Sequence, residues 1–226
     1  MFSVIKIFYL LFILSSLVLA FYPSADIGFS SIFYRGNNQF FVQHYLVSSS
    51  YFYEFVIRDV LMPLIVVFLL FFPIILKFSK YLKTKFHQYN FKIIDIFFIW
   101  VSAILVTGVV SSLLKNLWGR ARPVDTTIFD GDKIFTPWTF YSTQCLDNCS
   151  FVSGDASVGF FIACFYYITK NNKFIYLSII AGLIIGIVRI GAGAHFLSDI
   201  LMSFVVVNIV LQVTRYLFEK WEKTKA

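Results

Sequence analysis

Charged side chains are scarce in this sequence. Only 14% of its 226 residues are charged and 59% are hydrophobic, whereas a soluble domain usually contains about 25% charged residues. This scarcity excludes an ordinary soluble fold. The net charge of +7 would suit a nucleic-acid-binding protein only if the lysines and arginines lay on one soluble face. They lie between apolar runs instead, so we expect no nucleic-acid partner.

Residues that bind metal ions are also few, with three cysteines and three histidines in the chain. The spacing of Cys145 and Cys149 occurs in zinc sites, but the sequence has no second His/Cys cluster to complete one. We therefore expect no metal; the alternative is a disulfide between these two residues, which an oxidising compartment would favour. Cys164 lies inside an apolar run and is expected to be a small buried hydrophobe. Internal repeats and flexible linkers are absent as well, which favours a single domain over residues 1–226.

Long apolar runs are what the chain has instead. Three uncharged runs have close to the roughly 20 residues that a membrane-spanning helix needs: residues 7–25, 60–76 and 96–114. Three further apolar runs contain or adjoin one charge each: residues 149–169, 174–188 and 196–214. The sequence thus predicts an all-α polytopic membrane protein, a bundle of six transmembrane helices with a structured outer loop at about residues 116–149.

Two stretches near the N-terminus allow a second interpretation. Residues 7–20 follow a lone lysine and end in Val-Leu-Ala, which is also typical of a cleaved signal peptide. Residues 36–53 lack charge, but their Asn, Gln, His and Ser content favours a segment at the membrane interface, with Phe40, Tyr45 and Tyr53 as aromatic anchors. Neither interpretation changes the topology of the remaining helices.

Basic residues are divided unequally between the two sides of the predicted bundle. The side that holds both termini carries 12 of the 19 basic residues and 3 of the 12 acidic ones. The positive-inside rule makes this side cytoplasmic. The seven basic residues on the other side are therefore out of place, and their position needs a reason other than topology.

Three polar clusters fall at the outer ends of the predicted helices. They are residues 115–123 after the third helix, 153–155 near the start of the fourth, and 189–199 between the fifth and the sixth. Because the topology brings all three to one depth on one side, we expect them to converge in a functional site.

Ordinary structural roles compete for the charged members of these clusters. Arg120 is expected to extend to the lipid headgroups, as basic residues at helix ends often do. Lys115 and Arg122 are harder to explain in this way, because membrane-adjacent cations prefer the cytoplasmic side. Asp155 lies about one turn inside an apolar run, where a carboxylate is costly unless paired. An ion pair with one of the cations is therefore the alternative to a catalytic role.

His195 is the candidate nucleophile, although a hydrogen-bonded structural histidine is the ordinary alternative. Asp199 follows four residues later, which would put both side chains on one helical face. A carboxylate bonded to one ring nitrogen would fix the tautomer and leave the other nitrogen free to attack or to accept a proton. Gly191 and Gly193, just before it, would let the backbone approach an anion closely.

The patterns K-x6-R-P, S-G-x and R-x5-H-x3-D, in this chain order, resemble the three signature motifs of the type 2 phosphatidic acid phosphatase superfamily, whose membrane members have six spans. The resemblance implies a metal-independent phosphatase without a cofactor, in which His195 attacks phosphorus to form a phosphohistidine and Asp199 supports it. The phosphate-binding residues that it implies are Lys115, Arg122, Ser153, Gly154 and Arg189.

One departure from the superfamily pattern concerns the proton for the leaving group. Members usually carry P-S-G-H, whereas this chain has Val152-Ser153-Gly154-Asp155, so Asp155 takes the place of the acid-donating histidine. The strings at residues 131–135 and 144–157 are most similar to the lipid A 4'-phosphatases of Gram-negative bacteria, which this Asp accompanies.

That narrower resemblance implies an inner-membrane enzyme that removes the 4'-phosphate of lipid A on the periplasmic side, with no protein partner. Two other functions stay open. The substrate could be another lipid phosphate, such as polyprenyl diphosphate, phosphatidylglycerol phosphate or phosphatidic acid. Alternatively, the cations could form a non-catalytic site for a lipid or an anion.

Overall fold

The computed structural model describes residues 4–42, 60, 62–78 and 91–225, and within these ranges the chain is helical, with no strand. The elements are α1 (Val4–Phe21), α2 (Pro23–Ser31), α4 (Met62–Phe78), α6 (Ile93–Thr107), η2 (Gly108–Leu114), α7 (Lys115–Trp118), η3 (Pro123–Asp125), η4 (Thr127–Phe129), α8 (Gly154–Phe160), η5 (Phe161–Ala163), α9 (Cys164–Thr169), α10 (Lys173–Gly191) and α11 (Leu197–Lys225). The prediction of an all-α fold is confirmed.

Four helical segments in the described part of the chain are long and apolar enough to cross a membrane. They are Val4–Phe21, Ile93–Asp125, Lys173–Gly191 and Leu197–Lys225. Two shorter apolar helices, Pro63–Ile75 and Gly154–Thr169, lie where the second and fourth spans are predicted. Helices satisfy every backbone hydrogen bond internally, as an apolar bilayer requires. The number of six spans and the cytoplasmic termini stay predictions.

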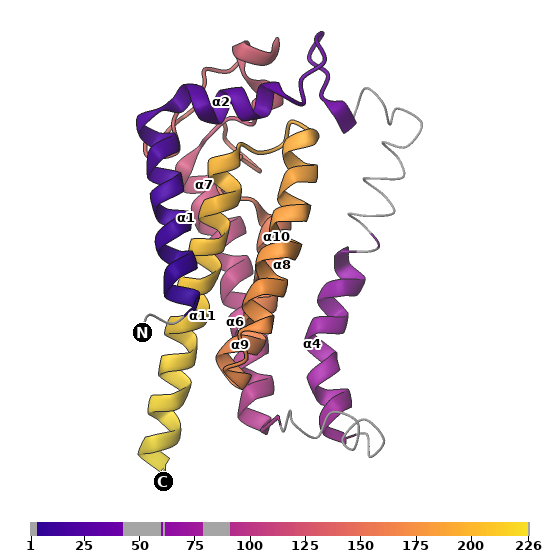
Figure 1. Ribbon diagram of the computed structural model, residues 1–226, viewed down its shortest axis with the longest axis vertical. Helices are drawn as coiled ribbons and strands as arrows, with labels where there is room; N and C mark the ends of the chain where they lie inside the picture. Colours follow the sequence, from indigo (N-terminus) through magenta and orange to yellow (C-terminus); the bar gives the residue numbers. More distant parts are fainter. Residues whose placement is uncertain (1–3, 43–59, 61, 79–90, 226) are drawn as a thin grey trace.

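The long helices run side by side, and α2 lies across one end of them (Figure 1). The loop after α7 and the connection between α10 and α11 lie at this same end, while the start of α1 and the end of α11 point the other way. The three polar clusters of the sequence therefore meet at one end of the bundle.

Helix α11 packs against α1, α6, α8 and α10. Phe204 on α11 packs against Phe12 of α1, with the ring centroids 4.4 Å apart. Phe160 of α8 packs against the Phe204 ring as well, at 5.4 Å. The helix runs well past the predicted end at residue 214, because Arg215 pairs with Glu219 one turn later and with Asp95 at the start of α6. Such i, i+4 pairs extend a helix beyond its apolar part.

Helices α8 and α10 approach each other closely through two glycines. A Cβ atom on Gly159 would lie 2.6 Å from the backbone nitrogen of Gly182, and one on Gly182 would lie 2.3 Å from the ring of Phe160. Small residues at such crossings let helix backbones touch. This contact fixes the position of α8 relative to α10. The first turn of α8 lies at the candidate site.

The helix that starts as α6 changes its period before it reaches the site. The backbone N–H of Lys115 bonds to the carbonyl of Val110, a π-type i to i−5 bond, and α7 ends at Gly119, which has a left-handed φ of 60°. Single π segments inside α-helices are frequent at functional sites. Here the π segment directly precedes Lys115.

Of the predicted interfacial segment at residues 36–53, the structure describes residues 36–42. Phe40 is fully buried and packs against Tyr34 and Phe129 beneath the outer loop. The expectation that Phe40 is a lipid anchor is therefore wrong, because the loop after α7 covers it. Tyr45 and Tyr53 lie outside the described residues.

Candidate active site

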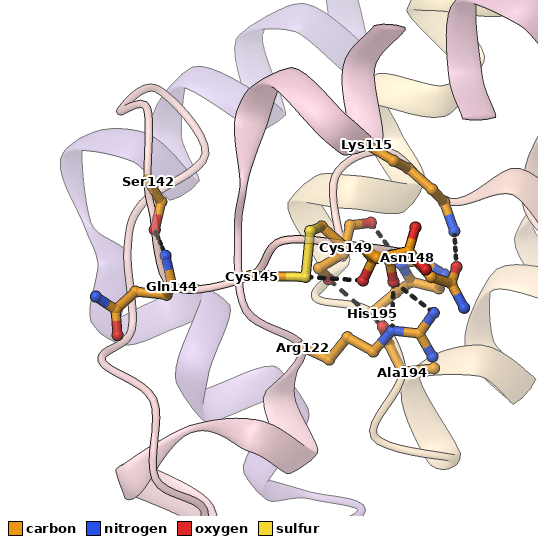
Figure 2. The surroundings of a disulfide bond; sticks show 11 residues. Lys115, Arg122, Ser142, Gln144, Cys145, Asn148, Cys149, Ala194 and His195 are labelled. Atoms are coloured by element: carbon orange, nitrogen blue, oxygen red, sulfur yellow. Dashed lines mark hydrogen bonds between the residues drawn. A yellow bond between two sulfur atoms is a disulfide. The ribbon is translucent and has the colours of Figure 1, made fainter. Parts of the chain in front are cut away.

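Asn148 joins the two cations of the first motif. The Lys115 Nζ donates to Asn148 Oδ1 at 2.8 Å, and the Arg122 guanidinium donates to the Asn148 carbonyl from Nη2 at 2.8 Å and from Nε at 3.1 Å. Figure 2 shows both side chains pointing toward Asn148, with His195 beside them. The structure thus brings Lys115, Arg122 and His195 together, although His195 lies more than 70 residues after Arg122 in the chain.

A disulfide fixes the segment that holds Asn148. Cys145 and Cys149 are bonded, with their Cα atoms 5.6 Å apart, and Asn148 lies inside this small ring with a left-handed φ of 49°. The backbone N–H groups of Cys145 and Ser150 donate to the carbonyls of Gly119 and Arg120 at 3.0 and 2.9 Å. The disulfide loop is therefore attached to the first motif at both ends (Figure 2).

A cavity of about 320 Å³ opens at this position. Its polar end is lined by Lys115, Asn148, Gly154 and Asp155. Apart from Thr107 and Ser157, the other lining residues are apolar, with side chains from α4, α6 and α8. The apolar lining includes Val66, Leu69, Leu70, Ala103, Val106, Val110, Val158 and Phe161. A ligand with a phosphate at one end and an apolar body would match this lining.

Asp155 and Arg189 form the ion pair that the sequence offers as one alternative. Arg189 Nε lies 2.9 Å from Asp155 Oδ2, and the arginine side chain is 5% exposed. The Nε–H is not directed at that oxygen and makes no hydrogen bond among the described residues. Asp155 also lines the cavity, so pairing with Arg189 does not remove it from the reach of a ligand.

His195 lies in the connection before α11 and not on the helix. Its Nδ1 is 2.7 Å from the carbonyl oxygen of Ser150 and 3.8 Å from Asp199 Oδ2. The expectation that His195 and Asp199 share a helical face is therefore wrong, because α11 begins only at Leu197. A carbonyl oxygen can only accept, so Nδ1 carries the proton and Nε2 keeps its lone pair.

The electrostatic surroundings of His195 keep its ring neutral. Burial is the main cause that lowers the pKa of His195 to about 4, and the nearby cations Arg189 and Lys115 lower it further, against the opposing effect of Asp199. A ring with this pKa is unprotonated at neutral pH. His195 therefore has an unprotonated ring nitrogen at neutral pH, as its predicted role requires.

Asp199 is held by hydrogen bonds on both of its oxygens. Oδ1 accepts from Arg120 Nη1 at 2.6 Å, while Oδ2 accepts from Ser150 Oγ at 2.5 Å and from the backbone N–H of Phe196 at 2.8 Å. The last contact is one half of a capping box at the start of α11. Asp199 therefore caps this helix and also lies near Nδ1 of His195.

Arg120 does not extend to lipid headgroups. It is 0% exposed, and its guanidinium bridges Asp199 to Asp26 at the start of α2. The expectation of an exposed arginine is wrong, because two buried carboxylates surround this side chain. The same argument that singled out Asp155, a lone carboxylate at the end of an apolar run, would have found Asp26. Asn148 and Ser150 lie in the string 144–157 that carries the narrower resemblance, but nothing in that string assigns either residue a role.

Ser153, Gly154 and Gly193 have clear local roles. The Ser153 side chain caps α8 by accepting from the backbone N–H of Ala156 at 3.3 Å, and Gly154 lines the cavity. Gly193 has a left-handed φ of 66°, and a Cβ there would lie 2.5 Å from the Phe40 ring. The close approach at Gly193 is thus to an aromatic ring, in the turn that delivers His195.

Metal binding has no structural support in the described ranges, where no group of three or more His, Cys, Asp or Glu side chains could hold an ion. If Asp155 does not supply the leaving-group proton, the sequence offers His44 on the same predicted side of the membrane, and His44 lies outside these ranges.

Comparison with known proteins gives a consistent result. The family model described as PAP2 superfamily matches residues 95–223. The lipid A 4'-phosphatase of Francisella tularensis subsp. novicida is 36% identical over 196 residues, which cover 83% of this chain and 83% of that protein. The lipid A 4'-phosphatases of Rhizobium etli and Rhizobium leguminosarum are 37% and 32% identical, but the matches cover only 44% and 51% of those proteins. No solved structure matches the chain. By the family match and the Francisella relative, the chain belongs to the PAP2 superfamily and is a phosphatase.

Proposed function

We propose that this protein is an integral membrane lipid phosphatase that removes the 4'-phosphate of lipid A on the periplasmic face, through a phosphohistidine intermediate. The observation that carries the proposal is the meeting of Lys115, Arg122 and His195 around Asn148, next to a cavity that Lys115 and Asn148 line. The names of the three relatives supply the substrate.

Binding of the phosphate rests on charge. A phosphate monoester carries about 1.5 to 2 negative charges at neutral pH, and Lys115, Arg122 and Arg189 supply three positive ones. The Asn148 oxygens accept hydrogen bonds from Lys115 and Arg122, so phosphate oxygens would take a similar place near the same donors. Fixed cations also neutralise the equatorial oxygens of the transition state, which is the main catalytic requirement of phosphoryl transfer.

In the chemical step, His195 Nε2 attacks phosphorus and forms an N–P bond while the bond from phosphorus to the sugar oxygen breaks. The Nδ1–H stays bonded to the Ser150 carbonyl, and Asp199 stabilises the positive charge that develops on the ring. Water then attacks the phosphohistidine, which releases inorganic phosphate and restores the free imidazole. Asp155 lies in the cavity wall; in its protonated form it would give the departing sugar oxygen a proton, and its carboxylate would regain one from the water that attacks the phosphohistidine.

The shape of the cavity supports a lipid substrate over a soluble one. Its polar end holds Lys115 and Asp155, and its apolar part extends between α4, α6 and α8, where an acyl chain would be shielded from water. A phosphate on a membrane lipid would reach the polar end with its chains alongside the helices. The candidate site lies at the end of the bundle that the predicted topology places outside the cytoplasm, which supports a reaction in the periplasmic leaflet.

Two measurements test this function. The mass spectrum of lipid A from cells with and without the protein should show loss of one phosphate, from the 4' position, only when the protein is present. Purified His195→Ala should show no turnover and should still bind orthovanadate, because the cations remain. Faster release of phosphate from phosphatidic acid or polyprenyl diphosphate, at equal detergent ratio, would assign a different lipid. Failure to trap an acid-labile, base-stable phosphate on the wild-type protein would exclude the covalent mechanism.

A further inference from the structure

Arg120 lies at the centre of a buried chain of charges behind the candidate site. Its Nη2 is 2.9 Å from Asp26 Oδ2, and its Nη1 is 2.6 Å from Asp199 Oδ1. Arg120 and Asp199 are 0% exposed and Asp26 is 1% exposed. Apolar residues of similar volume often stabilise a protein as well as buried ions do. Stability alone therefore does not explain why charges occupy this position.

Contacts to protein groups use all three guanidinium nitrogens of Arg120. Nε donates to the Thr136 carbonyl at 2.9 Å, Nη1 donates to Ser198 Oγ at 2.8 Å as well as to Asp199, and Nη2 donates to Asp26. The guanidinium also lies 4.3 Å from the ring centroid of Phe196, and the whole residue is 0% exposed. Arg120 therefore acts through its neighbours and does not contact the substrate.

Arg120 would affect the reaction mainly through its contact with Asp199. Arg120 holds one oxygen of this carboxylate, while Ser150 holds the other through its hydroxyl and at the same time accepts from His195 Nδ1 through its carbonyl. His195 and Asp199 are thus fixed relative to each other without a direct short hydrogen bond, at 3.8 Å. A change at Arg120 would move Asp199 away from the ring that becomes charged during phosphoryl transfer.

Asp26 fixes the other end of this chain of charges. It accepts from the backbone N–H of Ser198 at 3.0 Å and from Ser198 Oγ at 2.5 Å, and Ser198 is in the first turn of α11, directly before Asp199. One carboxylate on α2 therefore orients both Arg120 and the start of the helix that follows His195. Asp26 lies upstream of residues 95–223, to which the family match is confined.

We propose that Asp26 and Arg120 are positioning residues, which hold Asp199 and the start of α11 behind His195 and so set the rate of phosphoryl transfer without touching the substrate. The inference rests on the proposed function, since it assigns these residues to the same reaction. It predicts that kcat, and not KM, responds to changes in the buried chain of charges.

The test compares purified wild-type protein with Asp26→Asn and Arg120→Lys, using p-nitrophenyl phosphate and lipid A as substrates. For Asp26→Asn we expect kcat to fall about 100-fold, as for a misplacement of reacting groups by about 1 Å. The KM should stay within about twofold of wild type, because an interaction made only in the transition state is lost. Arg120→Lys keeps the charge and loses the planar fork, so its kcat should lie between those of the other two proteins.

Asp95→Asn is the matched control. Asp95 Oδ1 lies 2.8 Å from Arg215 Nη1 on α11, so the variant makes the same chemical change in a different ion pair, more than four turns along α11 from Ser198 and Asp199. Its kcat should equal that of wild type. Ser198→Ala adds a variant that keeps every charge and removes the hydroxyl that accepts from Arg120 and donates to Asp26. Its kcat should fall only about fivefold, because two hydrogen bonds are lost while both ion pairs remain.

Orthovanadate binding, measured by calorimetry, reports whether the phosphate site is folded in each variant. Asp26→Asn with vanadate binding and kcat like those of Asp95→Asn would overturn the positioning role. If Asp26→Asn does not fold, a wild-type kcat in Ser198→Ala overturns it instead. A wild-type protein that releases phosphate from p-nitrophenyl phosphate and not from lipid A would contradict the proposed substrate while leaving this comparison intact, and one that hydrolyses neither would contradict both proposals.

Discussion

Asp155 is the residue at which this chain departs from the superfamily pattern, and its role can be separated by the choice of leaving group. A sugar alkoxide needs a proton as it departs, whereas p-nitrophenolate does not. Asp155→Asn keeps the shape and hydrogen bonding of the side chain but cannot deliver a proton. We expect hydrolysis of lipid A to slow about 100-fold or more, within the range typical of general acid catalysis, and hydrolysis of p-nitrophenyl phosphate to slow far less.

The ion pair between Asp155 and Arg189 supplies the alternative role that this experiment separates from proton donation. If Asp155 serves only to hold Arg189, then Asp155→Asn should disturb phosphate binding equally for both substrates. Equal losses of kcat/KM would therefore assign Asp155 a structural role, and the proton would have to come from water or another group.

The lowered pKa of His195 predicts how kcat/KM depends on pH. A histidine with an ordinary pKa near 6.5 would give an acid limb in kcat/KM at that pH. Because burial lowers the pKa of His195 to about 4, the ring stays unprotonated as the pH falls through 6.5, and protonation removes the nucleophile only near pH 4. We expect kcat/KM, calculated for the phosphate dianion, to stay level down to about pH 5. An acid limb between pH 6 and 7 in this corrected profile would contradict the burial of the ring.

The disulfide loop is an element whose removal should affect binding first. It holds Asn148 and, through it, the geometry of Lys115 and Arg122. Replacing Cys145 and Cys149 together by serine should raise KM about tenfold, the equivalent of about 1.4 kcal/mol, and lower stability by about 2 kcal/mol, as expected for a small closed ring. Kinetics and thermal unfolding in detergent measure both effects.

Cys164 provides the control for this pair, because it is buried and free and lies away from the loop. Cys164→Ala should leave KM unchanged. A double serine variant with wild-type KM would mean that the loop keeps its conformation without the bond.

The crossing of α8 and α10 should tolerate no added side chain. In Gly159→Ala the new Cβ would lie 2.6 Å from the backbone of Gly182, which cannot move aside as a flexible side chain could. We expect destabilisation of about 1–3 kcal/mol, as for other overpacked sites, seen as a lower midpoint of thermal unfolding. Gly28→Ala on α2, where nothing lies within 4 Å of the added Cβ, should unfold at or above the wild-type midpoint. Equal midpoints for the two variants would show that α8 and α10 can separate.

At the scale of the whole molecule, the orientation in the membrane can be read from two exposed positions. Tyr141 is 71% exposed in the outer loop, and Lys223 is exposed near the end of α11. The native cysteines give a low background, since two are bonded and one is buried. A membrane-impermeant thiol reagent should label Tyr141→Cys in intact cells and Lys223→Cys only after permeabilisation. The reverse pattern would invert the predicted topology and move the site to the cytoplasm.

The sequence predicts the helices of this fold well, because the bilayer imposes a strong constraint on length and charge. The uncharged runs locate α1, α4 and α6 to within a few residues, and the chain order of the motifs brings Lys115, Arg122 and His195 to one end. Side-chain partners are harder to predict. Arg120 meets Asp26 across 94 residues of chain, and only the folded arrangement of α2 over α11 shows that both are buried.

The contact between Asp26 and Arg120 also bears on exchange of segments between related enzymes. The three motifs lie within residues 95–223, and a chimera made by replacing this part alone would seem to transfer the whole catalytic apparatus. It would separate Arg120 from the carboxylate on α2, and breaking a buried ion pair in this way costs about 3–5 kcal/mol. A functional chimera must therefore contain α2 and the three motifs from the same parent protein, so the exchanged segment must begin before residue 26.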